Sequence, residues 1–336
     1  TFLEHARKFA GNDLSFAALS LLSALFMPSQ IYTILPLIVV IACIAVFLNL
    51  SRTSELVIAR AAGRSAARFL IAPTLAIAGI GVFSVAVINP IVANTSTLYE
   101  AAVADLNGTS SNALTVSSEG VWLRQGTNTE QVIIHAERVN LAGTEFYDTT
   151  FFTSTTTGSL TQRVHANVAR LDEEQWLLSG VTRWPLAEWR NAQAEQETFD
   201  TMTVPTNLTI DQIRNSFGTP ASIPIWDLPG FIATLEQAGF SAKRHTVWWH
   251  MELALPLFLI AVALIGAAFT IQPSRLQNKG LMVLFAILCG FGLYFVRNFS
   301  QILGENGQLP PALAAWVPPF VGIGLCIALI LHQEDG

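Results

Sequence analysis

The sequence contains few charged residues. They make up 12% of its 336 residues, whereas a soluble domain usually carries about 25%. Lys8, Lys243 and Lys279 are the only lysines, and none lies in the G-x-x-x-x-G-K-[ST] pattern that binds nucleotide phosphates. Lysine and arginine total 18 and form no long run, which argues against a nucleic-acid partner. The chain is therefore not a P-loop ATPase, and any ATP-driven work must come from a partner.

Cysteine and clustered catalytic side chains are equally scarce. Cys43, Cys289 and Cys326 all fall within apolar runs, where a thiol behaves as a small apolar group rather than as part of a disulfide framework. No apolar run holds a cluster of His, Asp and Glu, and no nucleophile motif is present. We therefore expect neither a metal site nor catalytic residues, and no cofactor bound by this chain.

Long apolar runs are abundant, and they form two groups. An apolar run of about 18 or more residues can cross a membrane as a helix. Two runs lie before a polar, Thr-rich block of about 150 residues and three lie after it; they are Ile31–Leu50, Phe69–Ala93, Leu253–Ile271, Leu281–Val296 and Ala312–Leu331. Residues 13–28 are separated from the first run by Pro28-Ser29-Gln30, so we expect them to form an interfacial helix rather than another span. The pattern predicts a membrane protein with one large inserted domain.

The distribution of arginine predicts the orientation of the spans. The segment after the first run contains Arg52, Arg60, Arg64 and Arg68 against a single acid, Glu55. Because cytoplasmic loops are rich in Lys and Arg, we expect this segment inside. Alternation then places the central block outside and the C-terminus inside.

The central block is typical of a β domain. Five short β-rich runs with turn signals between them predict an all-β sandwich or jellyroll; they are Gly120–Gly126, Glu130–Ala136, Glu145–Ser154, Ser159–Leu171 and Gln175–Trp184. Two helices are expected to follow, over Thr209–Phe217 and Trp226–Gly239. Trp248-Trp249 then mark the start of the next span, as interfacial aromatic residues do.

Residues 53–63, between the first two runs, have the features of a short helix. They carry N-cap candidates, an acid in the first turn and a glycine stop. One interpretation is a connector that only sets topology. The other is a coupling helix that docks onto a cytoplasmic motor subunit, with Glu55, Leu56 and Arg60 as the contact residues.

Several motifs together resemble the LptF/LptG family of lipopolysaccharide-export permeases. Near the N-terminus they are Leu35-Pro36, the charge-free run after it, Ser54-Glu55-Leu56 and Arg60-Ala61-Ala62-Gly63. The stretch from Gly304 to Pro318 (GENGQLPPALAAWVP), Trp226-Asp227-Leu228-Pro229 and Gly120-Val121-Trp122-Leu123-Arg124 are similar to the LptG branch.

The resemblance implies six spans with a periplasmic β-jellyroll between the third and fourth. This chain shows five, and Phe2-Leu3-Glu4 resembles the end of a first span that is otherwise absent. The domains expected are residues 1–95, with the coupling helix at 53–63, then the β-jellyroll and following helix at 96–245, and a C-terminal transmembrane part at 246–336.

By the same resemblance, the protein is a bacterial inner-membrane permease subunit that extracts lipopolysaccharide and passes it to a periplasmic bridge. Its partners would be an LptF-type permease, a dimeric LptB-type ATPase that uses the ATP, an LptC-type bitopic protein and an LptA-type bridge. Two rival interpretations are a membrane-tethered periplasmic binding or scaffold protein and a membrane-embedded enzyme. A tether needs only one or two spans and no cytoplasmic helix.

Five residues are candidates for lipid contact. Arg7-Lys8 resembles the basic pair with which the family meets lipid phosphates, and a solvated helix end is the alternative. Arg297 follows a long charge-free run, so it either grips an anionic headgroup or extends its charge to the interface. Phe291 and Phe295 would form an apolar wall below it. For Glu252, near the outer interface, we expect a structural role.

Overall fold

A computed structural model shows two compact units within the chain. The first comprises residues 1–97, 220–228 and 243–336, and the second comprises residues 98–219 and 229–242. The structure describes residues 2–8, 15–52, 66–106, 114–117, 120–126, 130–140, 143–155, 159–172, 175–186, 196–206, 208–209, 213, 219–270 and 279–335. The predicted helix at 53–63 lies outside these residues, and the one at 209–217 lies almost wholly outside them.

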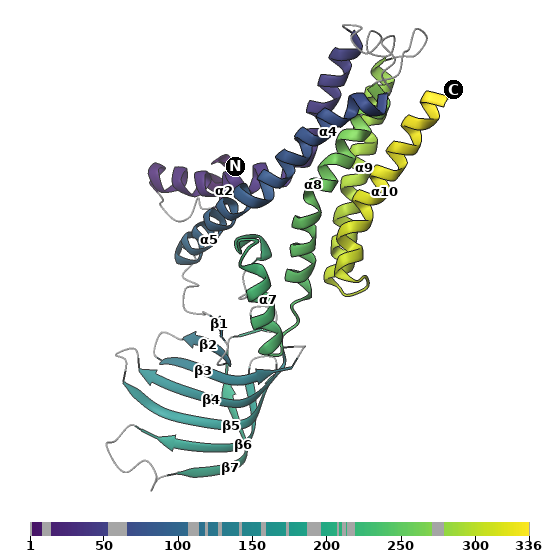
Figure 1. Ribbon diagram of the computed structural model, residues 1–336. Coiled ribbons are helices and arrows are strands. Elements are labelled where there is room, and N and C mark those ends of the chain that lie inside the picture. The colour runs from purple at the N-terminus through teal and green to yellow at the C-terminus, as the bar shows by residue number, and fades with distance from the viewer. Residues whose placement is uncertain are drawn as a thin grey trace. The chain divides into compact units, whose positions relative to one another are not determined.

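The first unit is built from helices (Figure 1). Its helical segments, with α5 and α7 continuing into the second unit, are α1 (Phe2–Lys8), α2 (Phe16–Arg52), α4 (Ala66–Phe83), the π-helical turn η1 (Ser84–Ile88), α5 (Asn89–Leu106), the 3-10 turn η2 (Pro220–Ser222), α7 (Leu228–Gln237), α8 (Lys243–Thr270), α9 (Lys279–Glu305) and α10 (Pro311–Asp335). Five stretches of the described residues are long and apolar enough to span a membrane. The predicted bundle of membrane helices with an inserted β domain is therefore confirmed.

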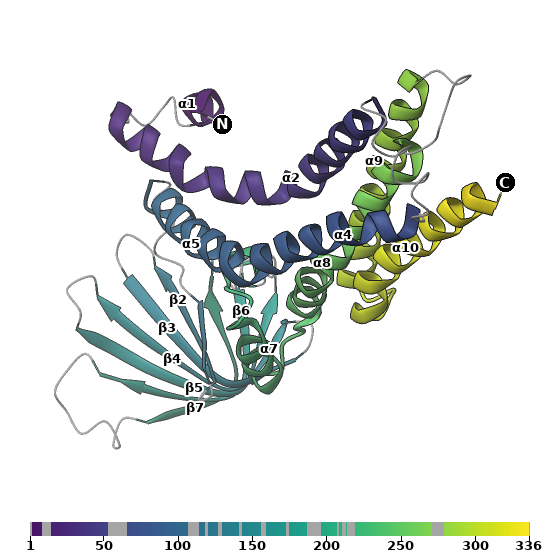
Figure 2. The same ribbon diagram turned by 45° about the horizontal axis from the view of Figure 1, so that its top comes forward.

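The separate interfacial helix expected at 13–28 is wrong, because α2 continues through Pro28 and Pro36. The helix bends along its length in Figure 2. Proline is tolerated within membrane helices, where nearby Ser and Thr side chains and local adjustment satisfy freed backbone groups. Ser29 and Thr33 donate hydrogen bonds to carbonyls about one turn earlier in the helix, at 2.8 and 2.9 Å.

Two spans are longer than their apolar runs predicted. Helix α8 begins at Lys243 rather than near Leu253, and α9 continues to Glu305 rather than ending at Val296. Both extensions carry polar side chains. A helix has to keep its backbone hydrogen-bonded in a membrane, so it continues past the last apolar residue, and hydropathy alone underestimates its length.

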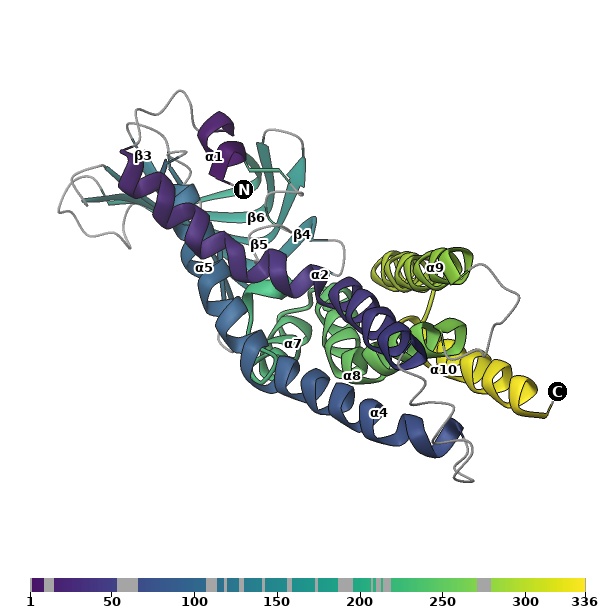
Figure 3. The same ribbon diagram turned by 90° about the horizontal axis from the view of Figure 1, so that it is seen from above.

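Helix α8 is the centre of the first unit, and it contacts α2, α4, α9 and α10. Figure 3 shows these helices grouped around it. Glycines allow close approach: a Cβ on Gly81 of α4 would lie 2.6 Å from Pro256 Cα of α8, and one on Gly290 of α9 would lie 2.9 Å from Val40 Cγ2 of α2. Small residues at helix crossings are typical of membrane bundles, because packing rather than the hydrophobic effect drives their association.

The second unit contains one seven-stranded antiparallel sheet in which every strand pairs with its chain neighbours. Figure 2 shows the strands fanning out in sequence order. They are β1 (Leu114–Ser117), β2 (Gly120–Gly126), β3 (Glu130–Val139), β4 (Glu145–Thr155), β5 (Leu160–Asp172), β6 (Gln175–Pro185) and β7 (Glu197–Pro205). The five predicted runs correspond to β2–β6. The first and last strands were missed, because β1 is only four residues long and β7 is mostly exposed and shows no buried alternation.

The core of the sheet is centred on Trp176, which is fully buried. The rings of Phe146 and Phe151 pack edge-on against it, with centroids 5.0 and 5.9 Å away. Leu235 of α7 belongs to the same buried cluster. The predicted helix at 226–239 is thus confirmed as α7, although it begins two residues later, after a turn.

Candidate functional site

Four helical segments of the first unit bring polar side chains together inside the bundle. Tyr32 comes from α2, Asn89 from the start of α5, Glu252 from α8 and Arg297 from α9. We call these four residues the polar network. Ionisable residues within membrane spans are costly and are functional candidates for that reason.

Glu252 is the most buried member, with 2% of its surface exposed. The Tyr32 hydroxyl donates a hydrogen bond to the Glu252 carboxylate. A buried carboxylate is expensive unless it is hydrogen-bonded and paired with a positive charge. Tyr32 supplies the hydrogen bond, so the remaining requirement is a cation.

Arg297 provides that cation. It interacts electrostatically with both Glu252 and Tyr32, and its guanidinium carbon lies 5.2 Å from the centroid of the Phe258 ring. A guanidinium over an aromatic face is attracted by the ring quadrupole. Arg297 itself is only half-buried, and within the described chain it makes no direct ion pair with Glu252. The arginine is therefore held near the carboxylate without being locked to it.

Asn89 connects the network to the segment that precedes α7. Its side-chain oxygen accepts a hydrogen bond from the backbone N–H of Ile225 at 3.0 Å, and its amide is within hydrogen-bonding range of Tyr32 and Glu252. The π-helical turn η1 ends immediately before Asn89, and such turns occur frequently at functional sites. The same segment is fixed a second time by Thr97, whose hydroxyl donates to Ser222 O at 2.9 Å.

The network lies at a common depth along its helices. Glu252 and Arg297 are each about 18 residues from the Thr270 and Lys279 ends of their helices, and Tyr32 is about 20 residues from the end of α2. At 1.5 Å per residue these distances are roughly 27–30 Å. The hydrocarbon core of a bilayer is about 30 Å thick. If these helix ends mark one membrane surface, the network lies at the other, at the depth of lipid headgroups.

Arg297 and the two candidate phenylalanines do not share a face of α9. Phe291 and Phe295 are 54% and 70% exposed, and they belong to an apolar stripe with Leu284, Leu288, Phe299 and Ile302. Arg297 follows Phe295 by two residues, which is about 200° around a helix. It lies instead on the face of Ala286 and Gly290, which packs against the bundle.

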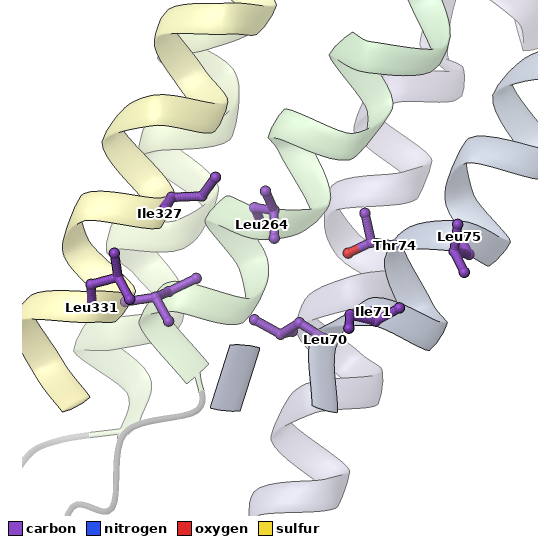
Figure 4. A pocket seen from close by; sticks show the side chains of 8 residues that line it. Leu70, Ile71, Thr74, Leu75, Leu264, Ile327 and Leu331 are labelled. Atoms are coloured by element: carbon purple, nitrogen blue, oxygen red, sulfur yellow. The ribbon is translucent and has the colours of Figure 1, made fainter. Parts of the chain in front are cut away.

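An apolar cavity of about 340 Å³ lies elsewhere in the first unit (Figure 4). Side chains from α4, α8 and α10 line it: Leu70, Ile71, Thr74, Leu75, Leu264, Ile327, Ile330 and Leu331. Thr74 is its only polar side chain. Leu264 is about three helical turns from Glu252 along α8, so the cavity is separate from the polar network.

The other candidate residues lie apart from this network or outside the described chain. Arg7 is exposed on α1, and the side chain of Lys8 is not among those described. Glu55, Leu56 and Arg60 lie in the segment that the structure does not describe. Of the network, the sequence singled out Glu252 and Arg297 but not Tyr32 and Asn89. A polar residue at the edge of one apolar run and an Asn-Pro within another were the available signals.

Within the described residues, no group of three or more His, Cys, Asp or Glu side chains is placed to hold a metal ion. The polar network also lacks a nucleophile next to a general base, which covalent catalysis would need. Its chemistry is that of a charged contact at headgroup depth. Such a site can bind and release an anionic group.

The chain matches a protein-family model over almost its whole length. The model describes the lipopolysaccharide export system permease LptF/LptG and matches residues 1–332. The curated lipopolysaccharide export system permease protein LptG of Haemophilus influenzae (strain ATCC 51907 / DSM 11121 / KW20 / Rd) is 25% identical over 350 residues. The alignment covers 99% of this chain and 91% of that relative.

Proposed function

Because the chain belongs to the lipopolysaccharide export permease family LptF/LptG, we propose that it is the LptG-type subunit of an ATP-driven exporter. This subunit would take lipopolysaccharide from the outer leaflet of the bacterial inner membrane and pass it to a periplasmic bridge. The observation that carries the proposal is the family match, which spans both groups of membrane helices and the inserted β domain. The match also confirms the resemblance that the sequence motifs indicated.

The partners follow from the division of labour in such an exporter. The chain has no phosphate-binding loop, so a separate dimeric LptB-type ATPase would supply the energy through residues 53–63. An LptF-type permease would cover exposed apolar surface such as the stripe on α9. LptC-type and LptA-type proteins would accept the lipid. The sheet ends in two edge strands, β1 and β7, and an edge strand can pair with a strand of another protein.

The polar network would contact the lipid headgroup. Arg297 lies at headgroup depth, is half-exposed, and carries a guanidinium that can grip a phosphate with two parallel hydrogen bonds. Below it, Phe291 and Phe295 would meet acyl chains or the partner permease from the opposite face of α9. Arg7 and Lys8 of α1 would add positive charge at the same membrane surface.

The first experiment is purification of the chain with its neighbours from a bacterial membrane. Co-purification of an ATPase and a second permease supports the exporter. Their absence supports a periplasmic domain that is merely tethered, although five spans exceed what a tether needs.

The second experiment is photocrosslinking of the assembled complex to lipopolysaccharide. Arg297→Glu should lose crosslinking near α9 while the complex still assembles. Arg244→Glu is the matched control, because Arg244 is an exposed basic residue in the first turn of α8. Equal crosslinking in wild type and Arg297→Glu would remove Arg297 from the lipid site.

A further inference from the structure

Arg297 has two possible partners if the proposed function holds. One is the phosphate of the transported lipid, and the other is the Glu252 carboxylate inside the bundle. A phosphate and a carboxylate compete for the same guanidinium, because both are planar or near-planar oxygen anions that accept its paired N–H groups. The burial of Glu252 and the half-exposure of Arg297 make this competition directional: only the arginine can reach a ligand.

We propose that Glu252 is an internal counter-ion for Arg297, a positioning residue that holds the guanidinium at the bundle when no lipid is bound and yields it to the lipid phosphate. The proposal rests on the proposed function, because it requires an anionic lipid at this site. It differs from the simple structural role expected for Glu252 from the sequence.

Three observations support an exchangeable contact rather than a fixed ion pair. Among the described residues, Arg297 interacts with Glu252 electrostatically and not through a direct ion pair. Its guanidinium instead rests over Phe258 at 5.2 Å, a contact worth only about 0.5–2 kcal/mol. Glu252 keeps a partner of its own in the Tyr32 hydroxyl, so the carboxylate is not left without a hydrogen bond when the arginine turns away.

The fourth observation is the position of Asn89. It ties the network to Ile225 through a backbone hydrogen bond of 3.0 Å, and its amide is within reach of the Tyr32–Glu252 pair. Tyr32 and Asn89 therefore fix the carboxylate from two helices while the arginine comes from a third. In such an arrangement the anion is held in place and the cation is free to change partners.

Two substitutions should move lipid binding in opposite directions. Glu252→Gln keeps an acceptor for Tyr32 but removes the charge that competes with phosphate. Lipopolysaccharide retained by the purified complex without ATP should then rise at least about fivefold, the lower end of typical coupling between two ligands, and ATP-driven release should slow. Tyr32→Phe removes the hydroxyl and leaves the carboxylate free to hold Arg297 more closely, so retention should fall.

The opposite signs separate a counter-ion from a structural contact, since loss of a purely structural contact would lower assembly and retention in both variants. Glu305→Gln is the matched control: Glu305 is an acid on α9 that accepts a hydrogen bond from Gln301 at 2.8 Å. Its retention should equal wild type. The double variant Glu252→Gln/Arg297→Gln should show no gain, because the gain passes through Arg297.

The chemistry of the ligand is tested with purified lipid A and its dephosphorylated form. The gain in Glu252→Gln should appear with the phosphorylated lipid alone, and an equal gain with both would overturn the proposal. Unchanged or lowered retention of lipopolysaccharide in Glu252→Gln would also overturn it. If the wild-type complex itself retains no lipopolysaccharide, the proposed function has failed, and that outcome is distinct from failure of the counter-ion.

Discussion

Gly239, after the end of α7, shows how one residue fixes the edge of the β domain. Its φ is +91°, and a Cβ there would lie 2.0 Å from the carbonyl oxygen of Val139. The neighbouring Ala238 carbonyl accepts a hydrogen bond from the Val139 N–H at 3.1 Å. The turn thus joins α7 to the end of β3 through a backbone contact that leaves no room for a side chain.

Gly239→Ala should therefore destabilise the second unit. Left-handed backbone strain costs about 1–3 kcal/mol, and the clash with Val139 adds to it. Gly230→Ala is the control, because Gly230 lies within α7 with nothing near its Cβ position, and replacing a helical Gly with Ala should stabilise by about 0.5–1 kcal/mol. Protease resistance of the β domain in increasing urea measures both. Equal midpoints for the two variants would contradict the assignment.

At the residue scale, the sequence predicted single groups but not their pairing. Arg297 and Glu252 stood out because a charge near an apolar run is unusual. Tyr32 and Asn89 did not, because Tyr at a membrane interface and Asn before proline are both ordinary. The network forms only when four helical segments from distant parts of the chain pack together. A single sequence contains no signal for such contacts.

At the scale of elements, the crossing of α4 and α8 depends on Gly81. A Cβ at that position would meet Pro256 at 2.6 Å from its Cα. Gly81→Ala should force the helices apart and destabilise the first unit by about 1–3 kcal/mol, the usual cost of overpacking. Thermal unfolding of the chain in detergent is the measurement.

Gly79→Ala is the matched control for this crossing. Gly79 is on the same helix, two residues earlier, with nothing within 4 Å of its Cβ position. The variant should melt at or slightly above the wild-type temperature. If both glycines tolerate alanine equally, the close approach of α4 to α8 is not what holds the bundle there.

The elements could be predicted to the extent that hydropathy and turn residues define them. All five apolar runs became helices, because a charge-free stretch of that length has few other stable forms in a membrane. Their ends were missed where the backbone continues through polar residues, as in α8 from Lys243. Strand β7 was missed because its mostly exposed residues lack the alternation that marks a half-buried strand.

At the scale of the whole molecule, the arrangement of the spans gives a topology that labelling can test. A cysteine in place of Ser159, which is exposed in the β domain, should react with a membrane-impermeant maleimide added from the periplasmic side. One in place of His332, at the end of α10, should not. The native cysteines all lie in membrane helices and provide the background. The reverse pattern would invert the orientation inferred from arginine asymmetry.

Coupling to the ATPase is tested at Glu55, which lies outside the described residues. An acid in the first turn of a helix contributes about 0.3–1 kcal/mol through the helix dipole. If Glu55 also pairs with the motor, Glu55→Lys should weaken co-purification of the ATPase or ATP-driven lipid release by more than that contribution explains. Normal co-purification and normal release would reduce Glu55 to a helix cap.

The central position of α8 has a consequence for the order in which the protein is made. Helices α2 and α4 pack against α8, but about 140 residues, including the whole sheet, are synthesised between α5 and α8. At about 5–20 residues per second, the early helices wait roughly 7–30 s in the lipid before their main partner arrives. During that time Gly81 and its neighbours face the bilayer. A ribosome stalled within the β domain therefore leaves two inserted helices with no core to join, which makes such a chain a substrate for membrane proteases.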